Sequence, residues 1–246
     1  MALGDTILMM NKFLAVLSPR LQAILKLFRE NGQCITLADI GTDHAYLPIA
    51  AVQGGFCESA IACDINAGPL KIADKNIRGA GLAGAIETRL GDGLLPLLPG
   101  EADCIVIAGM GGMRIWGILH EGMEQARQAG LLVLQPQHDT VLLRKNLHSA
   151  GFEILDEVIV REVVGGREYF YIIISARYVS GDFSWTEREY FLGKILLSKG
   201  GEDFSAYVRC EKEKIEAYIS QIRDETALSD AKKSLALLKE IDARGF

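Results

Sequence analysis

The stretch Leu37-Ala38-Asp39-Ile40-Gly41-Thr42-Asp43-His44 is the strongest indication of the fold of this chain. Its first half is an apolar run of strand length, and its second half is a polar turn that opens with a glycine. A glycine at the end of a first strand lets the backbone approach a ligand closely, and the following helix offers its N-terminal amides. The stretch therefore predicts a buried strand that leads into a ligand-binding turn.

Apolar runs of similar length recur along the chain as far as about residue 175. The first five are bounded by Gly, Pro or Asp and span 34–40, 59–65, 85–90, 103–109 and 131–136. Helical stretches accompany them at 45–53, 67–80, 113–129 and 139–150. Strands that are buried on both faces read as continuous apolar runs, so this alternation predicts an α/β protein with a doubly wound parallel sheet.

Two further apolar runs, 152–160 and 167–176, follow the parallel strands. The linker between them is too short for a crossover helix, so we expect an antiparallel hairpin with Gly165-Gly166 near its tip. The nicotinamide-binding version of this Rossmann-like fold usually continues with another parallel strand, whereas the class I methyltransferase version ends in such a hairpin. Five parallel strands and a terminal hairpin therefore favour the methyltransferase version.

The chain changes character at its two ends. Ser18-Pro19 predicts the start of a helix whose apolar stripe packs on the sheet edge. The alternative, a helix that faces a substrate, is supported by Arg20, Lys26 and Arg29. After about residue 180 the sequence predicts a helix from 184 to about 200 and then a coiled-coil-like helical hairpin. The expected domains are 1–180 and 181–246.

Heptad-like spacing carries the prediction of the terminal hairpin. Its first seam repeats every seven residues, and its second stripe follows a similar period. The seam residues are Val208, Ile215 and Ile222, widened by Tyr218 and Ile219, and the stripe residues are Leu228, Ala231, Leu235, Leu238 and Ile241.

Charge and composition limit the possible partners. The net charge is −6, of which −5 lies before residue 184, so any basic surface for nucleic acid must be local. No apolar run approaches the ~20 residues of a membrane helix, and a signal peptide is not indicated. We therefore expect a cytoplasmic protein that does not enter a membrane. The five cysteines lack metal-ligand spacing, and no metal is expected.

The turn after the first strand does not fit a dinucleotide. A nicotinamide or flavin fingerprint needs G-x-G-x-x-G, but two of its three glycines are missing from 41–46, and Asp43 would repel a pyrophosphate. S-adenosylmethionine instead presents an α-ammonium, which suits acidic residues, and a carboxylate, which suits backbone amides or Thr42. The turn favours S-adenosylmethionine.

Polar residues follow the next strands as well. Asp64 is placed to accept hydrogen bonds from ribose hydroxyls, Ile65 to pack on an adenine face, and Asp92, beside Gly93, to accept from the adenine amine. The alternatives are a helix cap for Asp64 and a simple turn for Asp92. Because parallel strands end at the same edge of the sheet, these residues are expected to line one crevice.

The fourth strand ends in Gly109-Met110-Gly111-Gly112, which indicates a close backbone approach to the methyl donor or to a target base. A flexible turn is the alternative. The Asn/Asp-Pro-Pro-aromatic motif of many adenine methyltransferases is missing here. Gln135-Pro136-Gln137, after the fifth strand, is expected to form a further polar rim.

These motifs together resemble one known family. The stretches ADIGTDHAYLP (38–48), DIN (64–66), GDGL (91–94), AGMGG (108–112) and LQPQ (134–137) resemble the bacterial tRNA (adenine-22-N1)-methyltransferases. The resemblance covers nearly the whole chain. It implies S-adenosylmethionine as methyl donor, tRNA as substrate and N1 of an adenine as the acceptor atom.

The predicted cofactor-binding residues come from four strand ends. They are Asp39, Gly41, Thr42, Asp43, His44, Asp64, Ile65, Asp92, Gly93, Gly109, Met110 and Gly111. Asp43 is also the predicted catalytic residue, because a carboxylate stabilises the positive charge that the methylated ring gains; the alternative is that it binds only the donor ammonium. For His44, the roles left open are a contact with the donor carboxylate, a contact with the base, or a structural one.

Other functions share parts of this pattern. A class I methyltransferase that acts on a small molecule or a protein would keep the same cofactor site. A non-catalytic RNA-binding module on this fold is a further alternative, although the acids at 39, 64 and 92 are all present.

Overall fold

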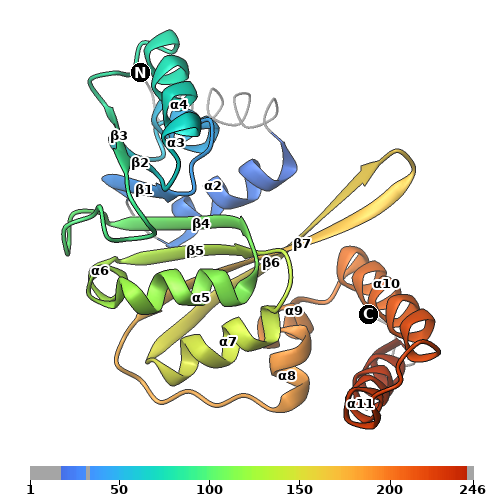
Figure 1. The fold of residues 1–246 in the computed structure, drawn as a ribbon. Coiled ribbons are helices and arrows are strands. Elements are labelled where there is room, and N and C mark those ends of the chain that lie inside the picture. The colour runs from blue at the N-terminus through green and yellow to red at the C-terminus, as the bar shows by residue number, and fades with distance from the viewer. Residues whose placement is uncertain (1–17, 32–33, 243–246) are drawn as a thin grey trace. The chain divides into compact units, whose positions relative to one another are not determined.

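A seven-stranded sheet forms the centre of the computed structural model, which describes residues 18–31 and 34–242 (Figure 1). The strand order is β3-β2-β1-β4-β5-β7-β6. The first five strands are parallel, and β7 runs antiparallel to β5. Their bounds are β1 Thr36–Ile40, β2 Ser59–Asp64, β3 Ile86–Leu90, β4 Cys104–Met110, β5 Leu131–Pro136, β6 Phe152–Val164 and β7 Arg167–Tyr178. The predicted sheet is confirmed.

The terminal hairpin is longer than its apolar runs predict. Strands β6 and β7 are separated only by Gly165 and Gly166, whose φ angles are 58° and 77°. Positive φ at both central residues is the pattern of a type I′ turn, which matches the twist of the two strands. The polar residues next to the turn therefore continue the strands instead of forming a loop.

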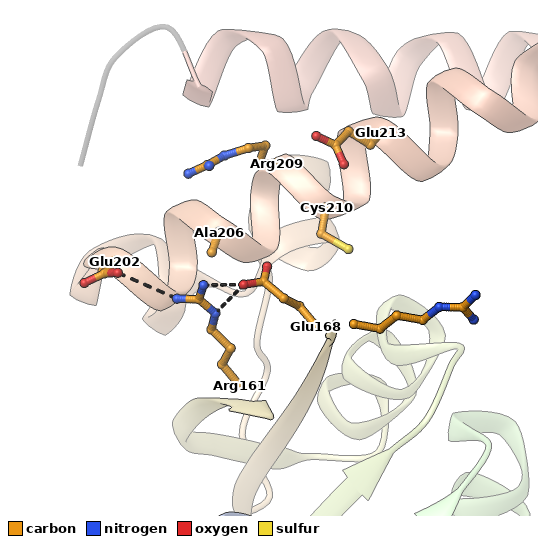
Figure 2. Close-up of a pocket in the computed structure, with 8 residues that line it drawn as sticks. Arg161, Glu168, Glu202, Ala206, Arg209, Cys210 and Glu213 are labelled. Atoms are coloured by element: carbon orange, nitrogen blue, oxygen red, sulfur yellow. Dashed lines mark hydrogen bonds and ion pairs between the residues drawn. The ribbon is translucent and has the colours of Figure 1, made fainter. Parts of the chain in front are cut away.

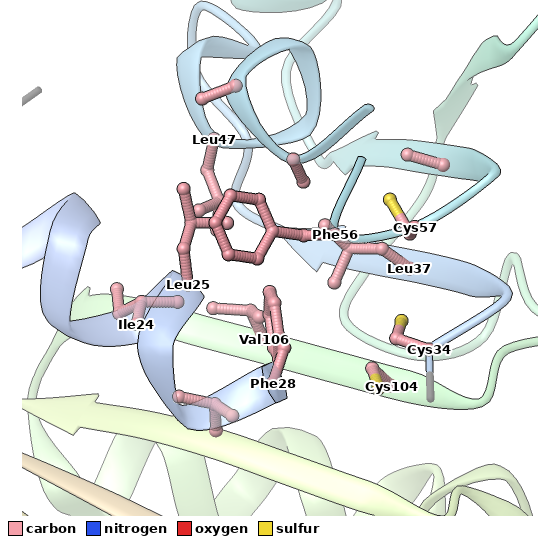
Figure 3. Packing of buried hydrophobic residues seen from close by; sticks show 14 of the residues in the cluster. Ile24, Leu25, Phe28, Cys34, Leu37, Leu47, Phe56, Cys57, Cys104 and Val106 are labelled. Carbon is pink, nitrogen blue, oxygen red and sulfur yellow. The ribbon is translucent and has the colours of Figure 1, made fainter. Parts of the chain in front are cut away.

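Helices cover both faces of the sheet. Helices α2 (Pro19–Asn31), α3 (Tyr46–Gln53) and α4 (Ala67–Gly79) contribute to one core with the strands. In this core Leu25 and Phe28 pack with Phe56 and Val106 (Figure 3). The remaining helices of the sheet are α5 Gly112–Glu121, α6 Met123–Gln128 and α7 Thr140–Ser149.

The expected single helix over 113–129 is wrong, because the chain breaks it at Gly122 into α5 and α6. A Cβ atom at Gly122 would lie 2.4 Å from Cβ of Leu94. The loop after β3 thus packs directly against the helix backbone at this point, and only glycine leaves room for it.

The chain divides into two compact units. The sheet unit comprises the residues up to Val160 together with Tyr171–Phe183, and the helical unit comprises Arg161–Phe170 together with the residues from Ser184 onward. The tip of the hairpin is thus grouped with the helices, whereas the sequence-based boundary at residue 180 leaves it with the sheet. That boundary stays a prediction.

The first helix of the helical unit is also interrupted. Thr186 and Glu189 form a capping box that starts α8 (Glu187–Leu192), and Gly193, with φ 90°, separates it from α9 (Lys194–Lys199). One continuous helix from 184 to 200 is therefore wrong. Left-handed backbone at Gly193 cannot be part of an α-helix.

The last two helices, α10 (Glu202–Ile219) and α11 (Glu225–Asp242), form the predicted hairpin. Its apolar seam is buried at Val208, Leu238 and Ile241, whereas Tyr218 is exposed and does not widen the seam. The hairpin is thus tightly packed at the end where α10 begins. None of the described helices is both long and apolar enough to cross a membrane.

Candidate active site

The turn between β1 and α3 is tied to the neighbouring strand by its backbone. The N–H groups of Gly41 and Thr42 both donate to the carbonyl oxygen of Cys63, each at 2.9 Å. Gly41 has φ 75°, and a Cβ atom there would lie 2.4 Å from Cε of Met110. The backbone conformation therefore favours glycine at position 41, and a larger residue there would also have to displace the end of the Met110 side chain.

Two residues of this turn adopt strained backbone. Asp43 and Ala45 have φ angles of 53° and 58°, in the left-handed region that side chains other than glycine rarely enter. The N–H of Asp43 donates to Oδ2 of Asp64 at 3.3 Å, which helps to hold this conformation. The Asp43 side chain is 68% exposed, and its Oδ2 lies 3.6 Å from Nε2 of His44. Strain of this kind is concentrated at functional sites.

Asp64 joins two turns at the end of β2. Besides the bond from Asp43, its Oδ1 accepts a hydrogen bond from the N–H of Asn66 at 2.8 Å. Asp64 is buried, whereas Ile65 beside it is exposed. The carboxylate therefore links the turn after β1 to Asn66, the N-cap residue of α4, but it is not itself the cap that the alternative expected. It stands next to an exposed apolar side chain.

Asp92 makes an ion pair on the surface of the sheet unit. Its Oδ1 lies 3.0 Å from Nη2 of Arg114, a residue of α5. Gly93, with φ 53°, has its Cα so close to α5 that a Cβ atom would lie 3.0 Å from Cγ2 of Ile118. An adenine amine would have to share the Asp92 carboxylate with Arg114, so this contact stays a prediction.

The end of β4 contains an irregularity that Gln135 stabilises. The register with β5 shifts between Ala108 and Met110, and Gly109 has φ 76°. The buried Gln135 accepts from the N–H of Gly109 at 3.1 Å and donates to the carbonyl of Pro136 at 3.1 Å. Gln135 therefore supports the turn from inside, and it also lines the candidate cavity, so its predicted place at the polar rim stays open.

Gly111 lies immediately beyond this turn, and a Cβ atom there would lie 2.4 Å from Cε1 of His138. The glycine thus allows the imidazole of His138 to rest on the backbone. His138 in turn pairs with Asp139 through Nδ1 and Oδ2 at 2.8 Å.

A cavity of about 360 Å³ lies where these turns meet. It brings together six of the predicted residues, and it excludes the six others, which lie around it at the ends of β2, β3 and β4. The six in its wall are Asp39, Gly41, Thr42, Asp43, His44 and Gly109. The six outside the wall are Asp64, Ile65, Asp92, Gly93, Met110 and Gly111.

Helix α2 supplies a wall of the cavity that the sequence only hinted at. Ser18, Arg20, Leu21 and Ile24 line it, and so does Tyr46 at the start of α3. The apolar stripe of the helix packs against the central strands and not at the sheet edge, so that expectation is wrong, and the first turn of the helix faces the cavity. Arg20 thus lines the cavity, and the alternative of a substrate-facing helix stays a prediction. Tyr46 could have been recognised in the sequence by its position directly after the predicted ligand-binding turn.

Burial favours the neutral form of the Asp39 carboxyl in the cavity wall. Removal from water raises the pKa of the Asp39 carboxyl to about 6, and the negative charge of Asp64 adds to this rise. Among the described residues, Oγ1 of Thr42 and Nδ1 of His44 are buried without a hydrogen-bond partner. Buried polar atoms normally have partners, so these two atoms in the cavity wall are suited to a polar ligand.

A second cavity, of about 560 Å³, lies within the helical unit (Figure 2). Arg161 in its wall is paired with Glu168 and lies 3.6 Å from Glu202. Its remaining charges are Arg167 and Arg209 against Glu213, so positive and negative groups balance. This cavity is larger but has no strained turn or converging strand ends, and the site in the sheet unit is the better candidate.

The strand order and the acidic turn without a dinucleotide fingerprint define a class I methyltransferase. Residues 37–243 match the family model described as tRNA (adenine(22)-N(1))-methyltransferase, TrmK. The chain belongs to this family.

Relatives of known sequence and structure agree with this assignment. The tRNA (adenine(22)-N(1))-methyltransferase of Bacillus subtilis (strain 168) is 35% identical over 93% of this chain and 98% of its own length. The structure of Streptococcus pneumoniae Sp1610 in complex with S-adenosyl-L-methionine has a TM-score of 0.81 at 31% identity, with 92% of this chain and 100% of that chain covered. M. capricolum TrmK, solved with S-adenosyl-homocysteine, has a TM-score of 0.73 at 28% identity, with 92% and 98% covered.

Proposed function

We propose that this chain transfers a methyl group from S-adenosylmethionine to N1 of adenine 22 in tRNA, giving 1-methyladenosine, and that it does so in the cytoplasm. One observation carries the proposal: a cavity with two acids and two unpartnered polar atoms lies at the strand ends of a methyltransferase fold. A relative that is 35% identical along nearly the whole chain is named for this reaction.

The residues around the cavity fit S-adenosylmethionine group by group. Asp39 and Asp43 suit the α-ammonium, and Thr42 with the backbone amides of its turn suits the carboxylate. The Asp64 carboxylate suits the ribose hydroxyls, and the exposed side chain of Ile65 beside it suits the adenine. Bound there, S-adenosylmethionine supplies a methyl group that its sulfonium charge activates.

The acceptor requires positioning more than proton transfer. N1 of adenine has a lone pair in the ring plane, so the chain does not need a base to create the nucleophile. Holding N1 in line with the methyl group in a pocket without water accounts for most of the expected acceleration. Asp43, in the turn after β1, either stabilises the cationic product ring or binds the donor ammonium.

The target base must be presented unpaired or be pulled out of its stack, because N1 lies on the edge used for pairing. Tyr46 offers it a platform: its ring is 62% exposed at the cavity, and it packs edge-on against His44 with ring centres 5.6 Å apart. Stacking on an aromatic side chain is the usual way in which proteins hold an extruded RNA base.

A methyl-transfer assay tests the proposal. Labelled S-adenosylmethionine and unmodified tRNA are incubated with the protein, and the nucleosides are then analysed. We expect 1-methyladenosine, and we expect it to disappear when adenine 22 is replaced. Transfer to another position, or no transfer despite donor binding by calorimetry, would overturn the acceptor assignment.

A further inference from the structure

Strand β3 lies at one edge of the sheet and pairs with β2 on its inner side (Figure 1). No strand among residues 18–31 and 34–242 pairs with its outer side. The N–H of Gly91, just after β3, donates to the carbonyl of Asp64 in β2 at 3.0 Å. Because backbone groups turn to alternate sides along a strand, every second residue before Gly91 also faces β2, and the residues between them face outward. Those outward residues are Ile86, Thr88 and Leu90.

Most backbone groups on this outer side are available to another strand. The N–H of Ile86 is occupied, because it donates to the carbonyl of Leu82 at 2.9 Å. In the described part of the chain, no backbone hydrogen bond is made to the outer N–H and carbonyl groups of Thr88 and Leu90. Unpaired groups of this kind on an edge strand are a template for pairing with a further strand.

The charges on β3 are complementary to those of a second β3 that runs antiparallel to it. With Thr88 of each copy on a two-fold axis, Glu87 of one copy stands opposite Arg89 of the other. A shift of the register by two residues would place Glu87 opposite Glu87, or Arg89 opposite Arg89, and like charges in that position are destabilising. The charge pattern therefore selects one register.

The same register satisfies the outward backbone groups. In an antiparallel ladder, residues that stand opposite each other exchange hydrogen bonds at every second position. The N–H of each Thr88 then meets the carbonyl of the other Thr88, and the N–H of each Leu90 meets the carbonyl of Ile86. Leu90, which is 61% exposed, comes to lie beside the apolar Ile86 of the other copy. The pairing that suits the charges thus also covers an exposed apolar side chain.

Exposed leucines extend the apolar surface into the loop after β3. Leu95 and Leu98 are 60% and 69% exposed. Arg89 fixes this loop, because its Nη1 donates to the carbonyl of Pro96 at 3.1 Å and to Oε2 of Glu101 at 2.7 Å. Exposed apolar side chains held in place beside an unpaired strand edge are typical of a contact with protein.

We propose that two copies of this chain associate through β3, antiparallel and about a two-fold axis at Thr88, so that their sheets become continuous. A two-fold interface uses the same surface on both copies, and it therefore requires a self-complementary surface such as this one. RNA is a poor occupant of this edge, because Arg89 is already paired with Glu87 and Glu101. The strand is short, so we expect a weak dimer that forms reversibly as the concentration rises.

Analytical ultracentrifugation of the full chain tests the proposal. The wild type should shift from monomer to dimer between about 1 μM and about 200 μM. Thr88→Pro removes the outward N–H while the bonds from β3 to β2 stay in place, and it should weaken the association about tenfold or more. Thr88→Val keeps that N–H and a β-branched side chain, so it is the matched control and should leave the association unchanged.

Reversal of one charge tests the register. Glu87→Lys places a lysine opposite Arg89 of the other copy, and it should also weaken the association about tenfold or more. Glu153→Lys is its matched control, because Glu153 lies in β6 at the other edge of the sheet and is likewise paired with an arginine, Arg177, at 3.0 Å. This control should leave the association unchanged.

Cross-linking measures the same register directly. The Cα atoms of opposite residues in a hydrogen-bonded antiparallel pair are about 5.5 Å apart, which a disulfide can span. Thr88→Cys should therefore give a covalent dimer with oxidised glutathione. The wild type is the control, because its cysteines are buried except for the partly buried Cys210.

The contrary outcomes are equally defined. A wild type that stays monomeric up to about 200 μM would overturn the proposal. So would a dimer that withstands both Thr88→Pro and Glu87→Lys, since the contact would then lie elsewhere on the surface. Equal weakening by Glu87→Lys and Glu153→Lys would contradict the charge pairing. Circular dichroism shows whether each variant folds, and if Thr88→Pro does not, the Glu87→Lys and Thr88→Cys results decide. None of these measurements depends on methyl transfer.

Discussion

An ion pair in the sheet unit and an ion pair in the helical unit differ in how far their side chains are exposed to water. In the sheet unit Arg144 and Glu157 form an ion pair at 2.7 Å in which both side chains are 0% exposed. In the helical unit Glu216 and Lys239 pair across α10 and α11 at 3.2 Å, with side chains 43% and 58% exposed. The Arg144–Glu157 pair is thus part of the packed interior of the sheet unit, whereas the Glu216–Lys239 pair of the helical unit stays in contact with water.

This difference has consequences for function. A site that must hold a donor and an acceptor atom in line needs groups that cannot move, and those are found in the sheet unit. Exposed and mutually paired charges cost little to rearrange, which suits contacts with a long and irregular partner such as RNA.

The largest effect is expected from the buried pair. Arg144→Met leaves Glu157 buried without its main partner and should lower the free energy of unfolding by about 3–5 kcal/mol. Lys239→Met, its matched control in the helical unit, should cost less than about 1 kcal/mol. Urea denaturation measures both. Similar losses for the two variants would remove the proposed distinction between the units.

The second effect concerns the buried acid of the cavity. The folded-state pKa of Asp39, about 6, is above its usual value of 3.8, so the folded protein binds this proton more tightly than the unfolded chain does. The stability that Asp39 contributes is therefore present below pH 4 and is lost as the pH rises through 6. A difference of about two pKa units corresponds to about 3 kcal/mol.

The Asp39→Asn variant isolates this term, because an amide does not titrate. Without ligand, its stability relative to the wild type should increase by up to about 3 kcal/mol between pH 4 and pH 7, measured by denaturation at each pH. The same variant should bind S-adenosylmethionine more weakly at pH 7. A stability difference that does not change with pH would contradict the raised pKa.

Asp64 is expected to show the next largest effect. Asp64→Asn weakens the acceptor for the ribose hydroxyls and the bonds to the Asp43 and Asn66 amides, so donor affinity should fall by roughly 30-fold. Calorimetry with S-adenosylmethionine gives the value. Asp74→Asn changes an acid that is paired with Arg78 on the surface of α4, and it serves as the control. Equal effects of the two substitutions would assign Asp64 a purely structural role.

The sequence predicts the site residues at the strand ends better than the site residues that helices α2 and α3 supply. Asp39, Thr42 and Gly109 are recognised because each stands at the end of an apolar run, and parallel strands end at one edge. Arg20 and Tyr46 reach the same cavity through the packing of α2 and α3, which no local pattern records. The breaks at Gly122 and Gly193 were missed for a related reason: the first depends on the approach of Leu94, a tertiary contact.

Two roles are open for Asp43: it stabilises the cationic product ring, or it binds the donor ammonium. Because its φ is positive, Asp43→Ala would add backbone strain, whereas asparagine tolerates this region and is the cleaner substitution. We expect Asp43→Asn to lower kcat about tenfold with little change in the dissociation constant of the donor, because the charge is needed when the ring becomes cationic. An increased dissociation constant with unchanged kcat would assign Asp43 to the donor ammonium instead.

The smallest effect is expected on the exposed face of the helical unit. Lys233 on α11 is 3.1 Å from Asp230, and both side chains are largely exposed. If this face contacts tRNA phosphates, Lys233→Ala should raise the KM for tRNA about two- to fivefold without changing donor affinity. Asp230→Asn, which frees the lysine from its partner, should lower that KM or leave it unchanged. Both measurements are made at low salt, where such contacts are strongest. An increase in KM from both substitutions would point to a loss of helix stability, and the RNA contact would then have to lie elsewhere in the helical unit.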